Sequence, residues 1–219
     1  MLKVGLTGGI ASGKSVVGEM LVALGAHLVQ ADRIAHQLML PGQPAYNEVV
    51  RHFGSAILDP DLRVNRAKLA EAAFGPVAEG KATPSTVPSR IQELNRIVHP
   101  AVIRSQDAWM EEMGRQDPHA VAIVEAALII EAGAAKRFDR LIVVTCTDEE
   151  RIARYAARQK LDLDAARKEV ERRMAAQLPE AEKIKAADYV IDNSGPLDQT
   201  REAVRKVWHH LRAEAATKG

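Results

Sequence analysis

The 219-residue sequence predicts a three-layer α/β/α fold, in which a parallel five-stranded sheet lies between two layers of helices. Short apolar runs alternate along the chain with helical segments, and several of these runs are apolar on both faces, as in parallel strands that are covered on both sides. A glycine-rich motif with a lysine and a serine at its end follows the first run directly. We expect a single domain over residues 1–219.

Each expected element comes from a local pattern. The strands are expected at residues 2–7, 26–30, 120–124, 140–145 and 189–191. Helices are expected at residues 14–24, 34–38, 44–53, 66–74, 91–113 and 161–178. Pro100 marks a new helix start or a kink in the long 91–113 segment. Residues 75–89 contain three prolines and two glycines, and we interpret them as a mobile surface loop.

The glycine-rich motif, residues 8–15, fits the phosphate-binding loop (P-loop) G-x-x-x-x-G-K-[ST], and its place between a strand and a helix predicts a P-loop NTPase fold. Its glycines let the backbone wrap a phosphate chain, Lys14 supplies a positive charge, and Ser15 can ligate Mg²⁺. The alternative is a glycine-rich turn that binds nothing. We predict nucleotide contacts at Gly9, Ala11, Ser12, Gly13, Lys14, Ser15 and Val16, with Ser15 as the metal ligand.

Ligands of open parallel sheets bind beyond the carboxyl ends of the strands, so the residues that follow each strand are candidates for a site. Asp32 follows the second strand, where it can act as a general base or bind a Mg²⁺-bound water. Its alternative role is the N-cap of the helix that begins near Ile34. Glu125 follows the third strand and is typical of the acid that holds a Mg²⁺-bound water, with an ordinary strand-end charge as the alternative.

Three arginines after the fourth strand share one helical face, because Arg151, Arg154 and Arg158 are spaced i, i+3 and i+7. They can form a lid that neutralises a triphosphate, or they can pair with the acidic residues beside them on a solvated face. Arg66 and His99 can contact an anionic substrate, although a single histidine is more often a structural hydrogen-bond donor.

Composition excludes several other classes of protein. Lys and Arg number 30 against 29 Asp and Glu, so no overall charge draws the chain to nucleic acid or to an anionic membrane. No apolar run approaches the ~20 residues that cross a bilayer, and the N-terminus lacks a signal-peptide pattern. We expect a cytoplasmic protein without nucleic-acid or membrane partners, and a monomer, with weak oligomers as the alternative.

Further motifs follow the loop in a fixed order. They lie at residues 24–26, 31–36, 41–45, 52–54, 65–66, 94–100, 128–131, 154 with 158, 174–177 and 187–193. Together with residues 5–15, this set resembles the dephospho-coenzyme A kinase family over nearly the full length. The resemblance implies transfer of the ATP γ-phosphate to the ribose 3′-hydroxyl of dephospho-coenzyme A, which gives coenzyme A and ADP in the last step of coenzyme A synthesis.

The resemblance also implies ATP and Mg²⁺ as cofactors, a helical substrate-binding part at about residues 34–113, and a lid at about residues 158–177. For catalysis it implies that Asp32 is the base, that Lys14 binds the β- and γ-phosphates and that Arg158 belongs to the lid. For binding it implies that Asp32, Arg66, His99 and Arg154 contact the substrate and that Asn193 lies near the adenine. The sequence departs from the family pattern at Gln30, where an aspartate is usual, at Ala11, where a glycine is common, and at Ala127, where a proline is expected.

Other functions fit the sequence less well. Another small-substrate kinase of the same architecture is the nearest alternative. A GTP-binding switch requires an N-K-x-D motif, which the sequence lacks. A nucleotide sensor without catalysis conflicts with the presence of Lys14, Ser15 and Asp32.

Overall fold

The computed structural model describes residues 1–74 and 90–218, so the loop expected at residues 75–89 lies outside the described residues. The strands are β1 (Leu2–Gly8), β2 (His27–Gln30), β3 (Val121–Glu125), β4 (Arg140–Thr145) and β5 (Tyr189–Asp192). The helices are α1 (Lys14–Ala23), α2 (Ala31–Leu38), α3 (Pro44–Phe53), α4 (Arg66–Phe74), α5 (Ile91–Gln116), α6 (Asp148–Gln159), α7 (Leu163–Ala175), α8 (Glu180–Lys185) and α9 (Leu197–Thr217), with short 3₁₀ turns η1 (Ser55–Ile57) and η2 (Ala135–Arg137).

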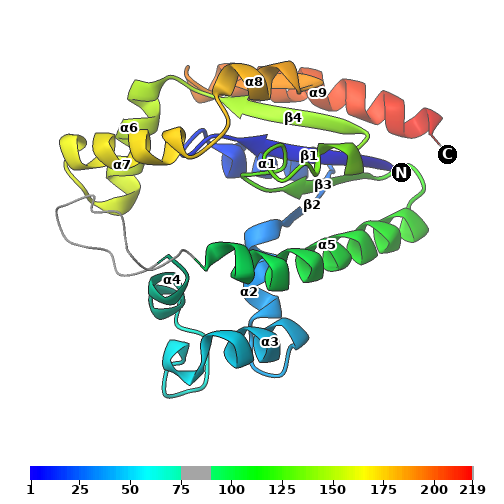
Figure 1. Cartoon of the computed structure of the whole chain (residues 1–219). Helices are drawn as coiled ribbons and strands as arrows, with labels where there is room; N and C mark the ends of the chain where they lie inside the picture. Colours follow the sequence, from blue (N-terminus) through cyan, green and yellow to red (C-terminus); the bar gives the residue numbers. More distant parts are fainter. Residues whose placement is uncertain (75–89, 219) are drawn as a thin grey trace. The chain divides into compact units, whose positions relative to one another are not determined.

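Within the described residues, the strands form one five-stranded parallel sheet in the order β2-β3-β1-β4-β5 (Figure 1). The register places Gly5 of β1 between Val124 of β3 and Leu141 of β4, so β1 is the central strand. The predicted fold class is confirmed, and the ends of the predicted strands differ from the observed ones by no more than one residue.

Helices cover both faces of the sheet, which is why the strands are apolar on both sides. On one face, Val17 and Leu21 of α1 and Leu211 of α9 pack on the alternate residues Val4 and Leu6 of β1. On the other face, the last part of α5 and the segment after β3 contribute the packing side chains, which include Met110 and Ile129. Burying each such aliphatic side chain contributes ~1.5–3 kcal/mol, so the sheet is a rigid base for the residues at its edge.

Contacts divide the chain into two compact units. The sheet unit comprises Met1–Gln30 and Trp109–Gly219, and the helical unit comprises Ala31–Ala108. The helical unit begins with α2 directly after β2. Pro100 lies inside α5, so of the two alternatives given for it, a new helix start or a kink, the new start was wrong. No helix in the described part of the chain is both long enough and apolar enough to span a membrane.

Candidate active site

The P-loop connects β1 to α1 in the sheet unit. Gly13 has φ = +91°, in the left-handed region that glycine adopts without strain. A Cβ at this position would also collide with the Asn193 side-chain amide. Ala11 occupies the left-handed region too, at φ = +53°. Helix α1 begins at Lys14, so its free N–H groups and the positive end of its dipole lie at the loop, as in other anion-binding helix starts.

Lys14 turns back over the loop. Its Nζ atom donates hydrogen bonds to the carbonyl oxygens of Gly8 and Gly9, each at 3.0 Å. The ammonium group is therefore held beside the loop amides. Val16, in the first turn of α1, is 39 % exposed and faces away from the core of the sheet unit.

Ser15, Glu125 and Gln30 form a hydrogen-bonded group beside the loop. The Ser15 hydroxyl donates to Glu125 Oε1 at 2.8 Å, and Gln30 Nε2 donates to Glu125 Oε2 at 2.9 Å. Parallel pairing brings Gln30 and Glu125 opposite each other at the ends of β2 and β3. Gln30 therefore places an amide donor beside Glu125, and this donor holds the buried Glu125 in place.

This group has the oxygen donors that Mg²⁺ requires. The Ser15 hydroxyl and the Glu125 carboxylate are hard ligands, and Mg²⁺ in phosphate-transfer sites is held by one or two protein oxygens together with the phosphates and water. Among residues 1–74 and 90–218, no cluster of three or more His, Cys, Asp or Glu residues offers an all-protein metal cage. The donor set therefore fits a nucleotide-bound Mg²⁺.

Asn193 and Arg154, both predicted from the sequence, converge on the loop through its Ser12 carbonyl. Asn193 Nδ2 donates to Ser12 O at 2.9 Å, and its Oδ1 accepts from Thr200 Oγ1 at 2.9 Å. Arg154 Nη2 donates to Asn193 O at 2.7 Å, and Nη1 reaches Ser12 O at 3.4 Å. The buried Asn193 side chain thus bonds to the protein at both ends, and it anchors the loop.

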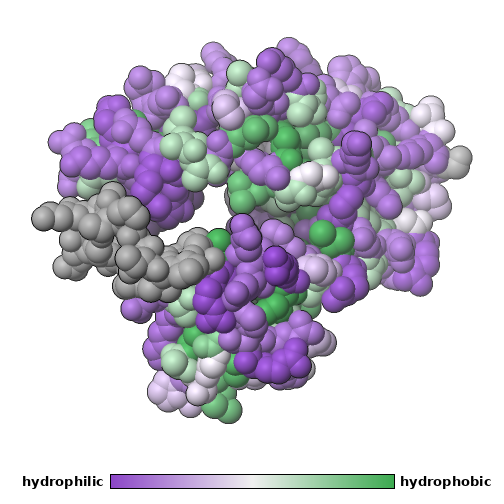
Figure 2. All heavy atoms as spheres, in the orientation of Figure 1, coloured by the Kyte–Doolittle hydropathy of each residue, from purple (hydrophilic) through white to green (hydrophobic). Residues whose placement is uncertain are grey.

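The three arginines of α6 have different environments. Arg158 is exposed, and its guanidinium lies 5.6 Å from the centre of the Tyr155 ring, as does that of Arg173 from α7. Arg151 is buried at 1 % exposure, although it has the same helical spacing. The pairing with neighbouring acids also occurs, because Arg154 contacts Glu150 at 3.1 Å. Figure 2 shows mostly hydrophilic side chains over α6 and α7, and the lid predicted at about residues 158–177 comprises α7 and the end of α6.

The other predicted substrate residues belong to the helical unit. Asp32 lies in the first turn of α2, which begins at Ala31, so the N-cap interpretation was wrong. Its carboxylate is exposed and has no hydrogen-bond or ion-pair partner within the described ranges. Arg66 begins α4, whose first N–H groups are capped by Asn65, and His99 lies on α5; both side chains are exposed.

One buried polar cluster was not predicted. Lys183 of α8, at 2 % exposure, forms an ion pair with Glu131 at 2.8 Å and donates to Gln177 Oε1 at 3.1 Å. Glu131 also accepts from the Leu178 N–H at 3.2 Å. The sequence around Lys183 alternates acids and lysines, which is typical of a solvated helix, so nothing local indicated this buried pair.

The parallel sheet, the P-loop and its lysine define a P-loop NTPase. The family model described as "Dephospho-CoA kinase" matches residues 2–199. Relatives named dephospho-CoA kinase include one from Leifsonia xyli subsp. xyli, 37 % identical over 97 % of this chain and 100 % of its own length. A second, from Corynebacterium jeikeium, is 40 % identical over 96 % of this chain and 100 % of its own.

Two solved structures share this fold. The crystal structure of TT1252 from Thermus thermophilus has a TM-score of 0.74 at 31 % identity, and the match covers 96 % of this chain and 97 % of that one. The dephospho-CoA kinase from Campylobacter jejuni, with a TM-score of 0.66 and 23 % identity, covers 97 % and 98 % and shows the same fold. The chain belongs to the dephospho-CoA kinase family. It is an ATP-dependent kinase of dephospho-CoA and acts in the last step of coenzyme A biosynthesis.

Proposed function

We propose a division of labour for this reaction, in which the γ-phosphoryl group of ATP passes to the ribose 3′-hydroxyl of dephospho-CoA and leaves CoA and ADP. The P-loop amides and the N-terminus of α1 bind the phosphates, and Lys14 contacts the β- and γ-phosphate oxygens. The supporting observation is the position of the Lys14 ammonium, which already lies 3.0 Å from two loop carbonyls. Phosphoryl transfer needs mainly positioning and charge neutralisation, and this loop supplies both.

Mg²⁺ is the proposed metal, with Ser15 and Glu125 as the residues that would hold it. When bound with ATP, it would neutralise negative charge on the phosphate oxygens. Ser15 and Glu125 are joined by a 2.8 Å hydrogen bond, and Gln30 fixes the second Glu125 oxygen. Gln30 is neutral, so Glu125 is the carboxylate that this group offers.

Asp32 is the proposed base, which accepts the proton of the ribose hydroxyl as the phosphoryl group is transferred. It is the second residue after β2, whose last residue Gln30 contacts Glu125. Its exposed carboxylate is free of intramolecular partners in the described portion of the chain, so it can accept a hydrogen bond from a substrate.

The helical part at about residues 34–113 is the proposed site of the acceptor, with Arg66 and His99 as contacts for its anionic groups. Residues 158–177 are the proposed lid, from which Arg158 would reach the transferring phosphoryl group. Arg154 has its guanidinium at the Ser12 carbonyl, so we place its contribution beside the phosphate loop. Asn193 acts on the nucleotide through the loop that it anchors.

The test of the base is Asp32→Asn, which keeps the size of the side chain and removes its basicity. We expect kcat to fall by about 10²- to 10⁴-fold while the affinity for ATP stays at the wild-type value. Product formation is followed by mass spectrometry with ATP, Mg²⁺ and dephospho-CoA. Glu48→Gln, an exposed carboxylate of α3 in the same unit, is the matched control and should keep full activity. Near-full turnover of Asp32→Asn would contradict the assignment.

We further propose that the protein acts in the cytoplasm as a monomer without nucleic-acid partners. The near-balanced charge of +1 supports the absence of nucleic-acid partners, because it gives no general attraction to polyanions. Sedimentation of the purified protein measures the oligomeric state.

A further inference from the structure

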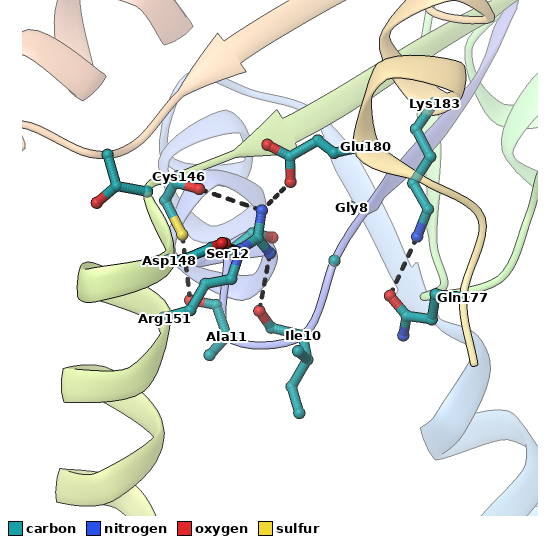
Figure 3. Close-up of polar contacts among 12 residues, drawn as sticks. Gly8, Ile10, Ala11, Ser12, Cys146, Asp148, Arg151, Gln177, Glu180 and Lys183 are labelled. Carbon is teal, nitrogen blue, oxygen red and sulfur yellow. Dashed lines mark hydrogen bonds and ion pairs between the residues drawn. The ribbon is translucent and has the colours of Figure 1, made fainter. Parts of the chain in front are cut away.

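Arg151 is a buried cation beside the P-loop with no role in the reaction scheme above. It lies in α6 beside the loop (Figure 3), and its side chain is 1 % exposed. Nη1 donates to the Ile10 carbonyl at 3.0 Å, and Nη2 donates to the Cys146 carbonyl at 3.1 Å. Nη2 also pairs with Glu180, the first residue of α8. One guanidinium group thus joins the loop, the end of β4 and the start of α8.

The contact with Ile10 orients a particular peptide group of the loop. In a trans peptide the C=O and N–H bonds point in opposite directions, so fixing the Ile10 oxygen toward Arg151 turns the Ala11 N–H away from it. The residue after this peptide, Ala11, is in the left-handed region at φ = +53°. A non-glycine residue there costs ~1 kcal/mol or more and needs surrounding contacts that hold it.

The guanidinium also packs directly against the backbone of the loop at Gly9. A Cβ at Gly9 would collide with Arg151 Nη1, so the loop backbone passes close over the cation. The Ser12 carbonyl is fixed in the same manner by Asn193, which turns the Gly13 N–H away. Side chains from outside the loop therefore hold two of its carbonyl groups, those of Ile10 and Ser12.

The charge of Arg151 is compensated by two carboxylates from different elements. Glu180 is 34 % exposed at its side chain, and Asp148 Oδ1 lies 3.4 Å from Nε. A buried cation is tolerated when it is paired and hydrogen-bonded, and removing one partner leaves the other charge uncompensated. The surroundings of Arg151 therefore stabilise its positive charge, although the side chain does not reach solvent.

We propose that Arg151 is a positioning residue of the phosphate loop, whose guanidinium fixes the Ile10–Ala11 peptide so that the Ala11 N–H is presented to the phosphates of ATP. Glu180 holds this guanidinium in place from α8. The proposal rests on the proposed ATP-binding role of the loop. It assigns to Arg151 an effect on nucleotide affinity and none on the binding of dephospho-CoA.

The test compares Arg151→Met, which removes every donor at similar length, with the double variant Arg151→Met/Glu180→Gln. The double variant also removes the carboxylate charge that the single variant leaves uncompensated. Arg201→Met is the matched control, because Arg201 is an exposed arginine of α9 that pairs with Asp198 at 2.6 Å. For each protein, the Kd of ATP is measured by calorimetry without acceptor, together with the thermal midpoint Tm and the KM of each substrate.

We expect Arg151→Met to weaken ATP binding about 10-fold, the usual effect of losing a charge-assisted hydrogen bond, and to lower Tm. In the double variant Tm should recover in part while the Kd of ATP stays about 10-fold weakened. The KM of dephospho-CoA should not change in either variant. If Arg151→Met does not fold, the double variant alone decides.

Two results would overturn the proposal: wild-type ATP affinity in the double variant, or equal losses of affinity for ATP and dephospho-CoA. Either would show that Arg151 supports only the general stability of the unit. Because ATP binding is measured without acceptor, an error in the proposed catalytic roles leaves this comparison unaffected. Turnover of dephospho-CoA by the wild-type preparation tests those roles separately.

Discussion

At the scale of single residues, the phosphate loop is shaped by contacts from outside it. Gly13 is required by its positive φ and by the Asn193 amide beside it. Ala11 has a positive φ as well, yet carries a Cβ. Its conformation is imposed by neighbouring hydrogen bonds, including those of Arg151 to Ile10 and of Asn193 to Ser12. An alanine at this position therefore introduces a small conformational strain into the loop.

This strain predicts that Ala11→Gly stabilises the protein. Glycine adopts φ = +53° freely, and relieving the alanine should add about 0.5–1 kcal/mol to the free energy of unfolding. Thermal unfolding should show Tm higher by about 1–4 °C for a protein of this size. Ala153→Gly, at an exposed helical position of α6, is the control and should lower Tm. A lower Tm for Ala11→Gly would mean that the loop gains nothing from glycine.

At the scale of elements, local sequence patterns predicted the strands and the phosphate-binding loop correctly. Apolar runs located the five strands, and the Asp162 side chain caps α7 by accepting from the Ala165 N–H at 2.8 Å. Residues whose role depends on long-range pairing could not be predicted. The interaction of Gln30 with Glu125 depends on strand register, and the burial of Arg151 depends on α8, 29 residues further on. The sequence D-E-E-R alone is typical of a solvated helix start.

Helix α7 of the proposed lid offers a test of local electrostatics. Hydrogen bonds from Arg172, and then from Arg173, lower the pKa of Glu169 to about 2. Since this pKa is below its usual value near 4.5, the ionised pair stabilises the fold above about pH 4.5, and the stabilisation is lost as the pH falls toward 2. Both arginines are largely exposed, so solvent screening limits the gain to ~1 kcal/mol or less.

We therefore expect Glu169→Gln to lower Tm at pH 7 and to be nearly indistinguishable from wild type close to pH 2. Chemical or thermal unfolding followed by circular dichroism at pH 7, 4.5, 3 and 2 gives the difference directly. Glu171→Gln on the same helix is the control, since Glu171 has no ion pair among the residues that the structure describes. A constant difference between Glu169→Gln and wild type across this range would rule out the ion pair as its cause.

At the scale of the whole molecule, the nucleotide site lies within the sheet unit, and the proposed base lies in the helical unit. Among the residues that the structure describes, the contacts of the phosphate loop from Arg151 and Arg154 of α6 and from Asn193 after β5 all come from the sheet unit, as does the pair of Gln30 and Glu125 beside Ser15. ATP binding should therefore be measurable without dephospho-CoA. A ligand that binds only the folded state raises Tm by mass action, so nucleotide affinity can be read from thermal unfolding.

This separation gives a prediction for Lys14→Ala. At an ATP concentration 100 times the wild-type Kd, the wild-type protein should gain about 2.7 kcal/mol, which corresponds to about 5–11 °C in Tm. Loss of the ammonium should cost about 2 kcal/mol of binding, so the same ATP concentration should shift the Lys14→Ala variant by only about 1–3 °C. Lys206→Ala, an exposed lysine of α9, should keep the full shift. An undiminished shift in Lys14→Ala would show that the ATP phosphates bind away from the ammonium group, and would remove Lys14 from the proposed mechanism.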